Sequence, residues 1–141
     1  MFELMIVRKR RQGAGLPRFV RDAGAVYSAF REEAELLDRE RFVVVLLDGK
    51  NRVLGFHVVS VGSLTAALVH PREVFKAAIL ANAAAVILAH NHPSGDPSPS
   101  AEDRALTARL RQAGELIGIR VLDHVVIGDG SYTSLAEREG W

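Results

Sequence analysis

Two histidines, a serine and an aspartate lie close together in the segment ILAHNHPSGDPSPSAED, residues 87–103. Side chains at positions i and i+2 of a strand point to the same side, so His90 and His92 can direct two imidazoles at one point. Asp103 lies at the start of the next expected helix, and a loop stiffened by proline can bring its carboxylate to the same place. Three protein ligands leave a tetrahedral zinc ion one open position for water.

The same segment also has a purely structural explanation. Ser100 and Asp103 fit the S-x-x-D capping box that begins many helices, and such a cap stabilises a helix end by about 1 kcal/mol. The stretch PSGDPSP would then be a connection rich in turn-forming residues, and the histidines would be polar residues at a strand end. The two explanations are compatible, because an aspartate in the first helical turn can also bind a metal.

The overall composition restricts the possible functions. The 141 residues include 18 basic and 17 acidic ones, for a net charge of +1, which gives no overall attraction to nucleic acid or membrane. One basic cluster, Arg8 to Arg11, is expected at the surface. There is no cysteine, so a metal must be held by histidine and carboxylate. No secretory signal or membrane-spanning run is evident, which favours a cytoplasmic protein.

The pattern of apolar residues predicts a three-layer helix–sheet–helix α/β domain with a mixed sheet. The chain is expected to form a single domain, residues 1–141, in which 1–19 are a peripheral strand and a basic loop. Helices are predicted from Val20 to about Asp38, at 70–82 and at 101–117, and strands at 42–47, 52–61, 83–90 and 119–128. The strands at 42–61 form a hairpin, which makes the sheet mixed, and residues 131–140 add a short strand or turn and about one helical turn.

The spacing His90-x-His92, seven residues, Ser100, two residues, Asp103 resembles the H-x-H-x7-S-x2-D signature of the JAB/MPN (JAMM) metallopeptidases. The words HNHPSGDPSPSAED, HPREVF and LDHVVIG resemble the RadC-like branch of that superfamily, from about Glu40 to Gly140. The resemblance implies a cytidine-deaminase-like fold. Many RadC-like proteins also carry an N-terminal helix-hairpin-helix module, which this sequence has no room for, so a stand-alone catalytic-type domain is expected.

By this resemblance, His90, His92 and Asp103 bind one zinc ion per chain, and the zinc lowers the pKa of a bound water toward about 7. A carboxylate near the water must take its proton and pass it to the leaving amine. Glu40, directly before RFVVVLL, matches the family's general base, although it could also be a solvated acid at a helix end. The hydroxyl of Ser100 would donate to the oxyanion.

The resemblance implies a zinc-dependent hydrolase that cleaves a peptide or isopeptide amide, and a ubiquitin-like tail is one conceivable substrate. Two other functions are considered: a DNA-repair-associated or nucleic-acid-binding protein, and a non-catalytic MPN scaffold. The near-neutral charge argues against the first, and the complete set of ligand positions argues against the second. Asp123 and His124 are either partners that orient a ligand imidazole or a satisfied buried pair, and His57 and His70 are expected to be structural.

Overall fold

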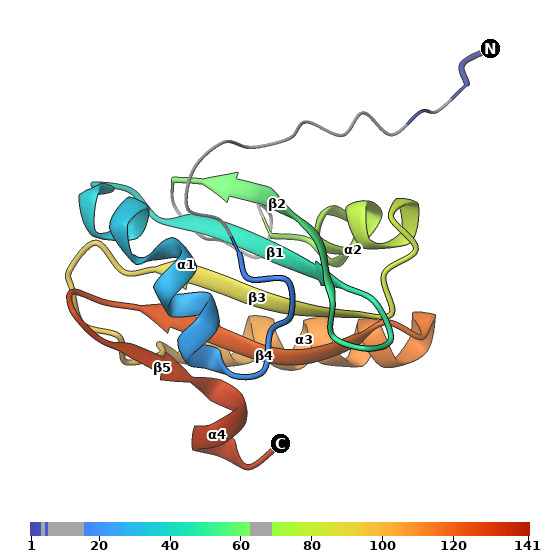
Figure 1. Ribbon diagram of the computed structural model, residues 1–141. Coiled ribbons are helices and arrows are strands. Elements are labelled where there is room, and N and C mark those ends of the chain that lie inside the picture. Colours follow the sequence, from blue (N-terminus) through green and yellow to red (C-terminus); the bar gives the residue numbers. More distant parts are fainter. Residues whose placement is uncertain (4, 6–15, 63–68) are drawn as a thin grey trace.

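The computed structural model describes residues 1–3, 5, 16–62 and 69–141 and contains a mixed five-stranded sheet (Figure 1). The strand order is β2-β1-β3-β4-β5, in which β3 and β4 are parallel and the other neighbours are antiparallel. The strands are β1 (Arg41–Leu47), β2 (Val53–Val61), β3 (Ala85–Asn91), β4 (Arg120–Ile127) and β5 (Tyr132–Ser134). The peripheral strand and basic loop predicted within residues 1–19 lie largely outside the described residues, and the Arg8–Arg11 cluster lies entirely outside them.

Helices cover both faces of this sheet, which confirms the predicted layered α/β fold (Figure 1). The helices are α1 (Ala23–Leu36), α2 (Pro71–Leu80), α3 (Ala101–Ile117) and α4 (Leu135–Glu139). One core forms between the sheet and α1, and the other between the sheet and the pair α2 and α3. Strand β3 supplies both cores, because its buried side chains alternate between the two faces.

The helix ends follow from local capping interactions. Helix α1 begins at Ala23, three residues later than predicted, because the Asp22 side chain accepts a hydrogen bond from the backbone N–H of Ala25 at 2.9 Å. His70 caps α2, since its Nδ1 accepts from the N–H of Arg72 at 3.2 Å. The prediction that His70 is structural therefore fits its position.

The sheet topology brings the carboxyl ends of β3 and β4 and the first residues of β1 to the same end of the sheet. Because β3 and β4 are parallel, their carboxyl ends lie side by side, with Asn91 beside Ile127. Strand β1 runs the opposite way, so its first residues lie at the same edge, and Phe42 pairs with His90. Glu40, which precedes β1, is thereby brought to the edge where His90 and His92 lie. Ligand sites in α/β sheets favour this position beyond the strand ends.

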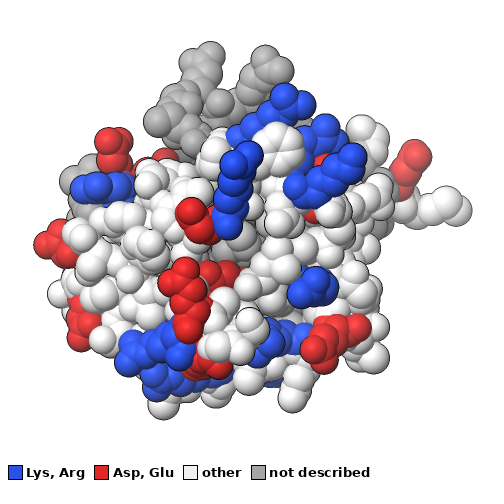
Figure 2. All heavy atoms as spheres, turned by 60° about the horizontal axis from the view of Figure 1, so that its bottom comes forward, with Lys and Arg blue, Asp and Glu red and all other residues white. Residues whose placement is uncertain are grey.

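Acidic and basic side chains lie among one another on the described part of the face drawn in Figure 2. This mixture agrees with the net charge of +1. Among the described residues, no helix is long and apolar enough to cross a membrane.

Gly114 allows the chain to turn back tightly after α3. A Cβ at this position would lie 2.3 Å from the carbonyl oxygen of Ile119 and 3.3 Å from the Phe75 ring. We expect Gly114→Ala to lower the free energy of unfolding by about 2 kcal/mol through this overlap, although alanine is otherwise the better helix former. Urea denaturation measures the change.

Gly55→Ala is the matched control, because an added Cβ there meets nothing within 4 Å. Its free energy of unfolding should stay within about 0.5 kcal/mol of the wild type. Equal free energies of unfolding for the two variants would show that the close approach at Gly114 does not affect stability.

Candidate metal centre

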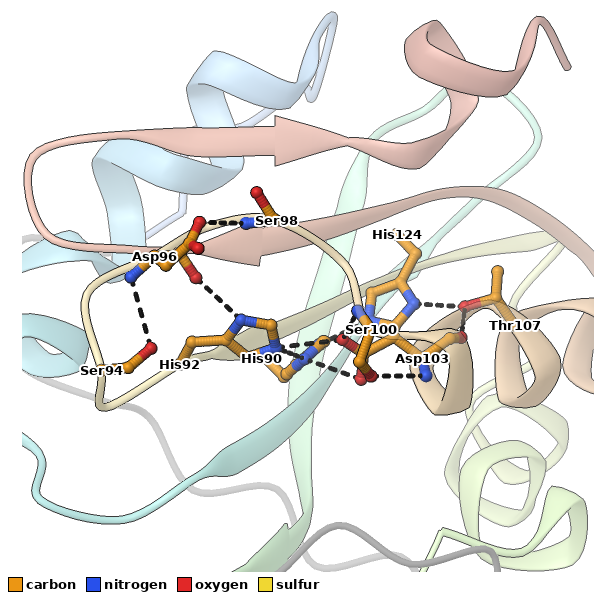
Figure 3. A network of polar contacts seen from close by, with 9 residues as sticks. All are labelled: His90, His92, Ser94, Asp96, Ser98, Ser100, Asp103, Thr107 and His124. Atoms are coloured by element: carbon orange, nitrogen blue, oxygen red, sulfur yellow. Dashed lines mark hydrogen bonds and ion pairs between the residues drawn. The ribbon is translucent and has the colours of Figure 1, made fainter.

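The side chains of His90, His92 and Asp103 point toward one another at the carboxyl end of β3 (Figure 3). The two histidine Nε2 atoms are 3.0 Å apart. Asp103 Oδ2 lies 3.0 Å from His92 Nε2, and Asp103 Oδ1 lies 3.3 Å from His90 Nε2. Together these residues form a group that could hold a metal ion.

Each of the two histidines is fixed by the backbone or by a buried neighbour. His90 belongs to β3, has only 2% of its surface exposed and stacks on Phe42. His92 follows the strand, and its backbone N–H donates to the carbonyl of Ile127 at 2.9 Å. Its ring Nδ1 lies 2.8 Å from the carbonyl oxygen of Asp96. A carbonyl can only accept, so Nδ1 carries the hydrogen in this contact and Nε2 faces Asp103.

Asp103 acts as a helix cap and as a member of the triad at the same time. Ser100 Oγ accepts from the N–H of Asp103 at 3.0 Å, and Asp103 Oδ2 accepts from the N–H of Ser100 at 2.8 Å. This is the reciprocal capping box expected from the sequence. The same hydrogen bond fixes the carboxylate that faces the two histidines. The helix cap and a metal site at this segment are therefore compatible.

The loop between His92 and Ser100 is fastened to the end of β4. The N–H of Asp129 donates to the carbonyl of Gly95 at 2.8 Å, and Gly95 has a φ of +86°, which favours glycine. A Cβ on Gly128 would lie 2.3 Å from the Gly95 carbonyl oxygen and 2.8 Å from Cδ of Pro97. Only glycine at position 128 lets the loop approach this closely.

The carboxyl group of Asp103 is held in its charged form. Burial acts to raise its pKa, but the adjacent imidazoles of His90 and His92 and the N–H of Ser100 together lower that pKa far below its usual range. The pKa of His92 is raised, chiefly by its hydrogen bond with Asp103 and against the effect of burial. A metal ion would have to displace this proton, so metal binding should release protons.

The donor set of the triad fits a small tetrahedral metal ion. In such a site, metal–ligand distances of about 2.0–2.1 Å place neighbouring ligand atoms about 3.3 Å apart. The two Nε2 atoms here are 3.0 Å apart, and each lies 3.0 to 3.3 Å from one oxygen of the Asp103 carboxylate. Three atoms with lone pairs that converge this closely need a cation between them, either a proton or a metal ion. Two histidines and one aspartate also leave one of four positions open.

Glu40 lies close to the triad without belonging to it. Its charge contributes to the raised pKa of His92, so its carboxylate is within electrostatic range of that imidazole. The group of side chains able to hold a metal does not include it. Its backbone carbonyl accepts from the N–H of Gly62 at 2.7 Å, which fixes the chain just before β1.

Of the two residues on β4 predicted as possible partners of a ligand imidazole, His124 contacts the triad and Asp123 does not. His124 is fully buried, and its Nε2 lies 2.7 Å from Nδ1 of His90, so it directly contacts a residue of the triad. Burial lowers the pKa of His124 well below its usual value. Asp123 instead accepts from the Ser134 hydroxyl at 2.6 Å and from the N–H of Ala136 at 3.0 Å, which fastens β5 and α4 to β4.

A β-bulge decides which of these two residues contacts the triad. The register of β4 against β3 shifts by one residue between Val86 and Ile87. Val121 therefore packs in the core beside α2 and α3, whereas Val125, an even number of residues later, packs in the core beside α1. Regular alternation along β4 would have placed Asp123, not His124, on the side of the triad.

Sequence reasoning missed Thr107. Its hydroxyl lies 2.6 Å from Nδ1 of His124 and 2.6 Å from the carbonyl oxygen of Asp103. The sequence places this polar residue four positions after Asp103, which puts both residues on the same side of the helix. That spacing could have indicated a role for Thr107 beside the site. Thr107 is 2% exposed, so this polar group lies in the core.

A mixed α/β domain with two histidines and an aspartate converging at the strand ends defines a candidate metal-dependent α/β domain. The family profile of the RadC-like JAB domain matches residues 20–141. The chain therefore belongs to the RadC-like JAB domain family, as its resemblance to the JAB/MPN signature predicted.

Two of the relatives that resemble this chain in sequence have the name UPF0758 protein. The protein of this name from Moorella thermoacetica is 57% identical over 119 residues, which cover 84% of this chain and 52% of the relative. The one from Symbiobacterium thermophilum is 60% identical over 114 residues, 81% of this chain and 49% of the relative. The chain thus spans about half the length of the curated relatives it matches.

Metal binding can be tested directly with zinc as the probe. We expect one zinc ion per chain by elemental analysis after loading and desalting, and loss of that zinc in His92→Ala or Asp103→Ala. Binding should weaken from about pH 8 to about pH 6, because protons compete for the imidazole nitrogens. His57→Ala is the control, since His57 lies in β2 outside the group able to hold a metal. Equal zinc content in all four proteins would contradict a site at the triad.

The close approach at Gly128 predicts a second effect on the same site. Gly128→Ala should push the Gly95–Pro97 segment away and so displace His92, lowering zinc affinity about 10-fold, as other changes behind metal ligands do. Isothermal titration of the metal-free protein measures the affinity. Gly49→Ala, where an added Cβ meets nothing within 4 Å, should bind zinc as the wild type does. If Gly128→Ala also bound zinc with wild-type affinity, the Gly95–Pro97 segment would not position His92.

Proposed function

We propose that this domain is a zinc-dependent hydrolase that cleaves a peptide or isopeptide amide bond. The observation that carries the proposal is the combination of a three-ligand cluster at the carboxyl end of β3 with a nearby carboxylate, Glu40, outside that cluster. Zinc is the metal of choice because two imidazoles, one carboxylate and an open position are a common catalytic zinc environment. Membership of the RadC-like JAB family supports the same chemistry.

His90, His92 and Asp103 would hold the ion. A zinc ion bound there supplies Lewis acidity, which polarises the substrate carbonyl and acidifies water toward a pKa of about 7. Glu40 would take a proton from the attacking water, because its carboxylate is within electrostatic range of His92 but is not needed as a ligand. The same carboxyl group can then give that proton to the leaving amine.

Ser100 would stabilise the negative charge that develops on the carbonyl oxygen. Its Oγ accepts from the N–H of Asp103, so the hydroxyl keeps its own hydrogen to donate. Ser100 is an exposed residue, and its backbone N–H donates to the Asp103 carboxylate of the triad. Loss of one such donor typically lowers the rate by about 100- to 1,000-fold.

The substrate class we propose is an extended peptide segment, such as the flexible C-terminal tail of a ubiquitin-like protein. The alternative of nucleic-acid binding has less support, because charges of both signs are mixed on the described part of the face in Figure 2. A non-catalytic scaffold would not need three ligand side chains arranged at metal-binding distances. Since the chain spans about half of its curated relatives, these proposals concern the domain described here.

Glu40→Gln should keep zinc but lose hydrolysis. We expect a rate decrease of about 100- to 10,000-fold, because the amide cannot carry the proton, with unchanged zinc content. Cleavage is measured by mass spectrometry of new peptide termini after incubating zinc-loaded protein with a peptide library prepared from a bacterial proteome. The same variant should also capture uncleaved substrates.

Glu32→Gln is the matched control, because Glu32 is an exposed acid on α1. It should cleave the library as the wild type does, and a chelator should abolish cleavage by both. Full activity of Glu40→Gln would exclude Glu40 as the base. Cleavage that survives the chelator and the loss of His92 would exclude the zinc mechanism itself.

A further inference from the structure

A buried hydrogen-bond path connects helix α3, strand β4 and strand β3 behind the triad (Figure 3). Thr107 Oγ1 lies 2.6 Å from Nδ1 of His124, and Nε2 of His124 lies 2.7 Å from Nδ1 of His90. Thr107, His124 and His90 are 2%, 0% and 2% exposed, so no water competes for these contacts. Each end of the His124 ring has one partner.

The direction of this path follows from the hydroxyl of Thr107. That hydroxyl has a single hydrogen, and its oxygen lies 2.6 Å from the carbonyl oxygen of Asp103. A carbonyl can only accept, so the hydrogen of Thr107 is committed to Asp103. Toward His124, Thr107 therefore presents only lone pairs, and Nδ1 of His124 must carry a hydrogen.

The position of the hydrogen on His124 then determines that on His90. A fully buried imidazole is neutral, because burying its charged form without a counter-charge is costly, and a neutral imidazole has one N–H. With this hydrogen on Nδ1, Nε2 of His124 is an acceptor. The 2.7 Å contact with His90 then requires a hydrogen on Nδ1 of His90.

We propose that Thr107 and His124 are positioning residues that set the tautomer and the ring orientation of His90. The hydrogen on Nδ1 leaves Nε2 of His90 with its lone pair directed at His92 and Asp103. The opposite tautomer would put a hydrogen on Nε2, where a metal must bind. Partners behind a ligating histidine commonly act in this way. The inference rests on the proposed function only in treating the triad as a metal site.

The path also links two members of the triad through one helix. The carbonyl that commits the hydrogen of Thr107 belongs to Asp103, whose carboxylate faces His90 at 3.3 Å. Helical geometry places Thr107 one turn after Asp103. A single turn of α3 therefore delivers one ligand and, through His124, orients another.

The proton positions can be observed directly in the metal-free full chain. Long-range proton–nitrogen correlation spectra of nitrogen-15-labelled protein report which ring nitrogens carry hydrogen. We expect His124 to have a protonated Nδ1 and a bare Nε2, and His90 to have a protonated Nδ1. A hydrogen on Nε2 of His124 would overturn the proposal. This spectrum of the wild type decides the point even if a variant fails to fold.

Three variants test the consequence for metal binding. Thr107→Val has nearly the same shape but no hydroxyl, and it should lower zinc affinity about 10- to 100-fold and change the ring-nitrogen pattern of His124. Thr107→Ser restores the hydroxyl and should bind zinc as the wild type does. Ser134→Ala removes another buried hydroxyl, one that bonds to Asp123 rather than to His124, and should leave zinc affinity unchanged.

These measurements separate this inference from the proposed function. If the wild type binds zinc and Thr107→Val binds it equally well, the positioning role is wrong and the zinc site remains. If Ser134→Ala weakens binding as much as Thr107→Val, the effect is one of general packing and the inference fails. If the wild type binds no zinc, the proposed function and this role in metal binding both fail.

Discussion

The convergence of three atoms with lone pairs, Nε2 of His90, Nε2 of His92 and a carboxylate oxygen of Asp103, is the constraint on which the rest of the site depends. The two Nε2 atoms are 3.0 Å apart and each lies 3.0 to 3.3 Å from an oxygen of the Asp103 carboxylate, so these groups repel one another unless a cation lies among them. The fold must therefore hold them together from outside. It does so with one contact behind each ligand, from His124, from the Asp96 carbonyl and from the Ser100 N–H.

The fold provides these outer contacts because three elements end or begin at the same sheet edge. Strand β3 carries His90 just before its last residue, the parallel strand β4 carries His124 in contact with the His90 ring, and Asp103 lies in the first turn of α3. The apolar residues on both faces of β3 keep the strand in place. Burial of these residues supplies the stabilisation that offsets the crowding of the polar groups at the edge.

Much of this arrangement could be predicted from local sequence. The order of helices and strands follows from apolar periodicity, and the spacing of His90, His92, Ser100 and Asp103 predicts both the cap and the triad, since these residues are close along the chain. Which of Asp123 and His124 contacts the triad could not be predicted, because the bulge in β4 changes which side chains face α3. Alternation alone favours Asp123. Thr107 and Gly128 depend on long-range contacts that have no local pattern.

The distribution of burial across the site separates support from chemistry. His90 and His124 are buried at 2% and 0% exposure, whereas the His92 side chain is 15% exposed and Ser100 belongs to an exposed residue. The hydrogen bond that orients His90 thus lies in the low-dielectric interior, where it is strongest. The His92 side chain and the exposed residue Ser100 lie nearer to the solvent. A surface used only for docking needs no such division, because docking requires a complementary outer face and not a fixed tautomer beneath it. The division therefore favours a reacting site over a docking surface at this edge of the sheet.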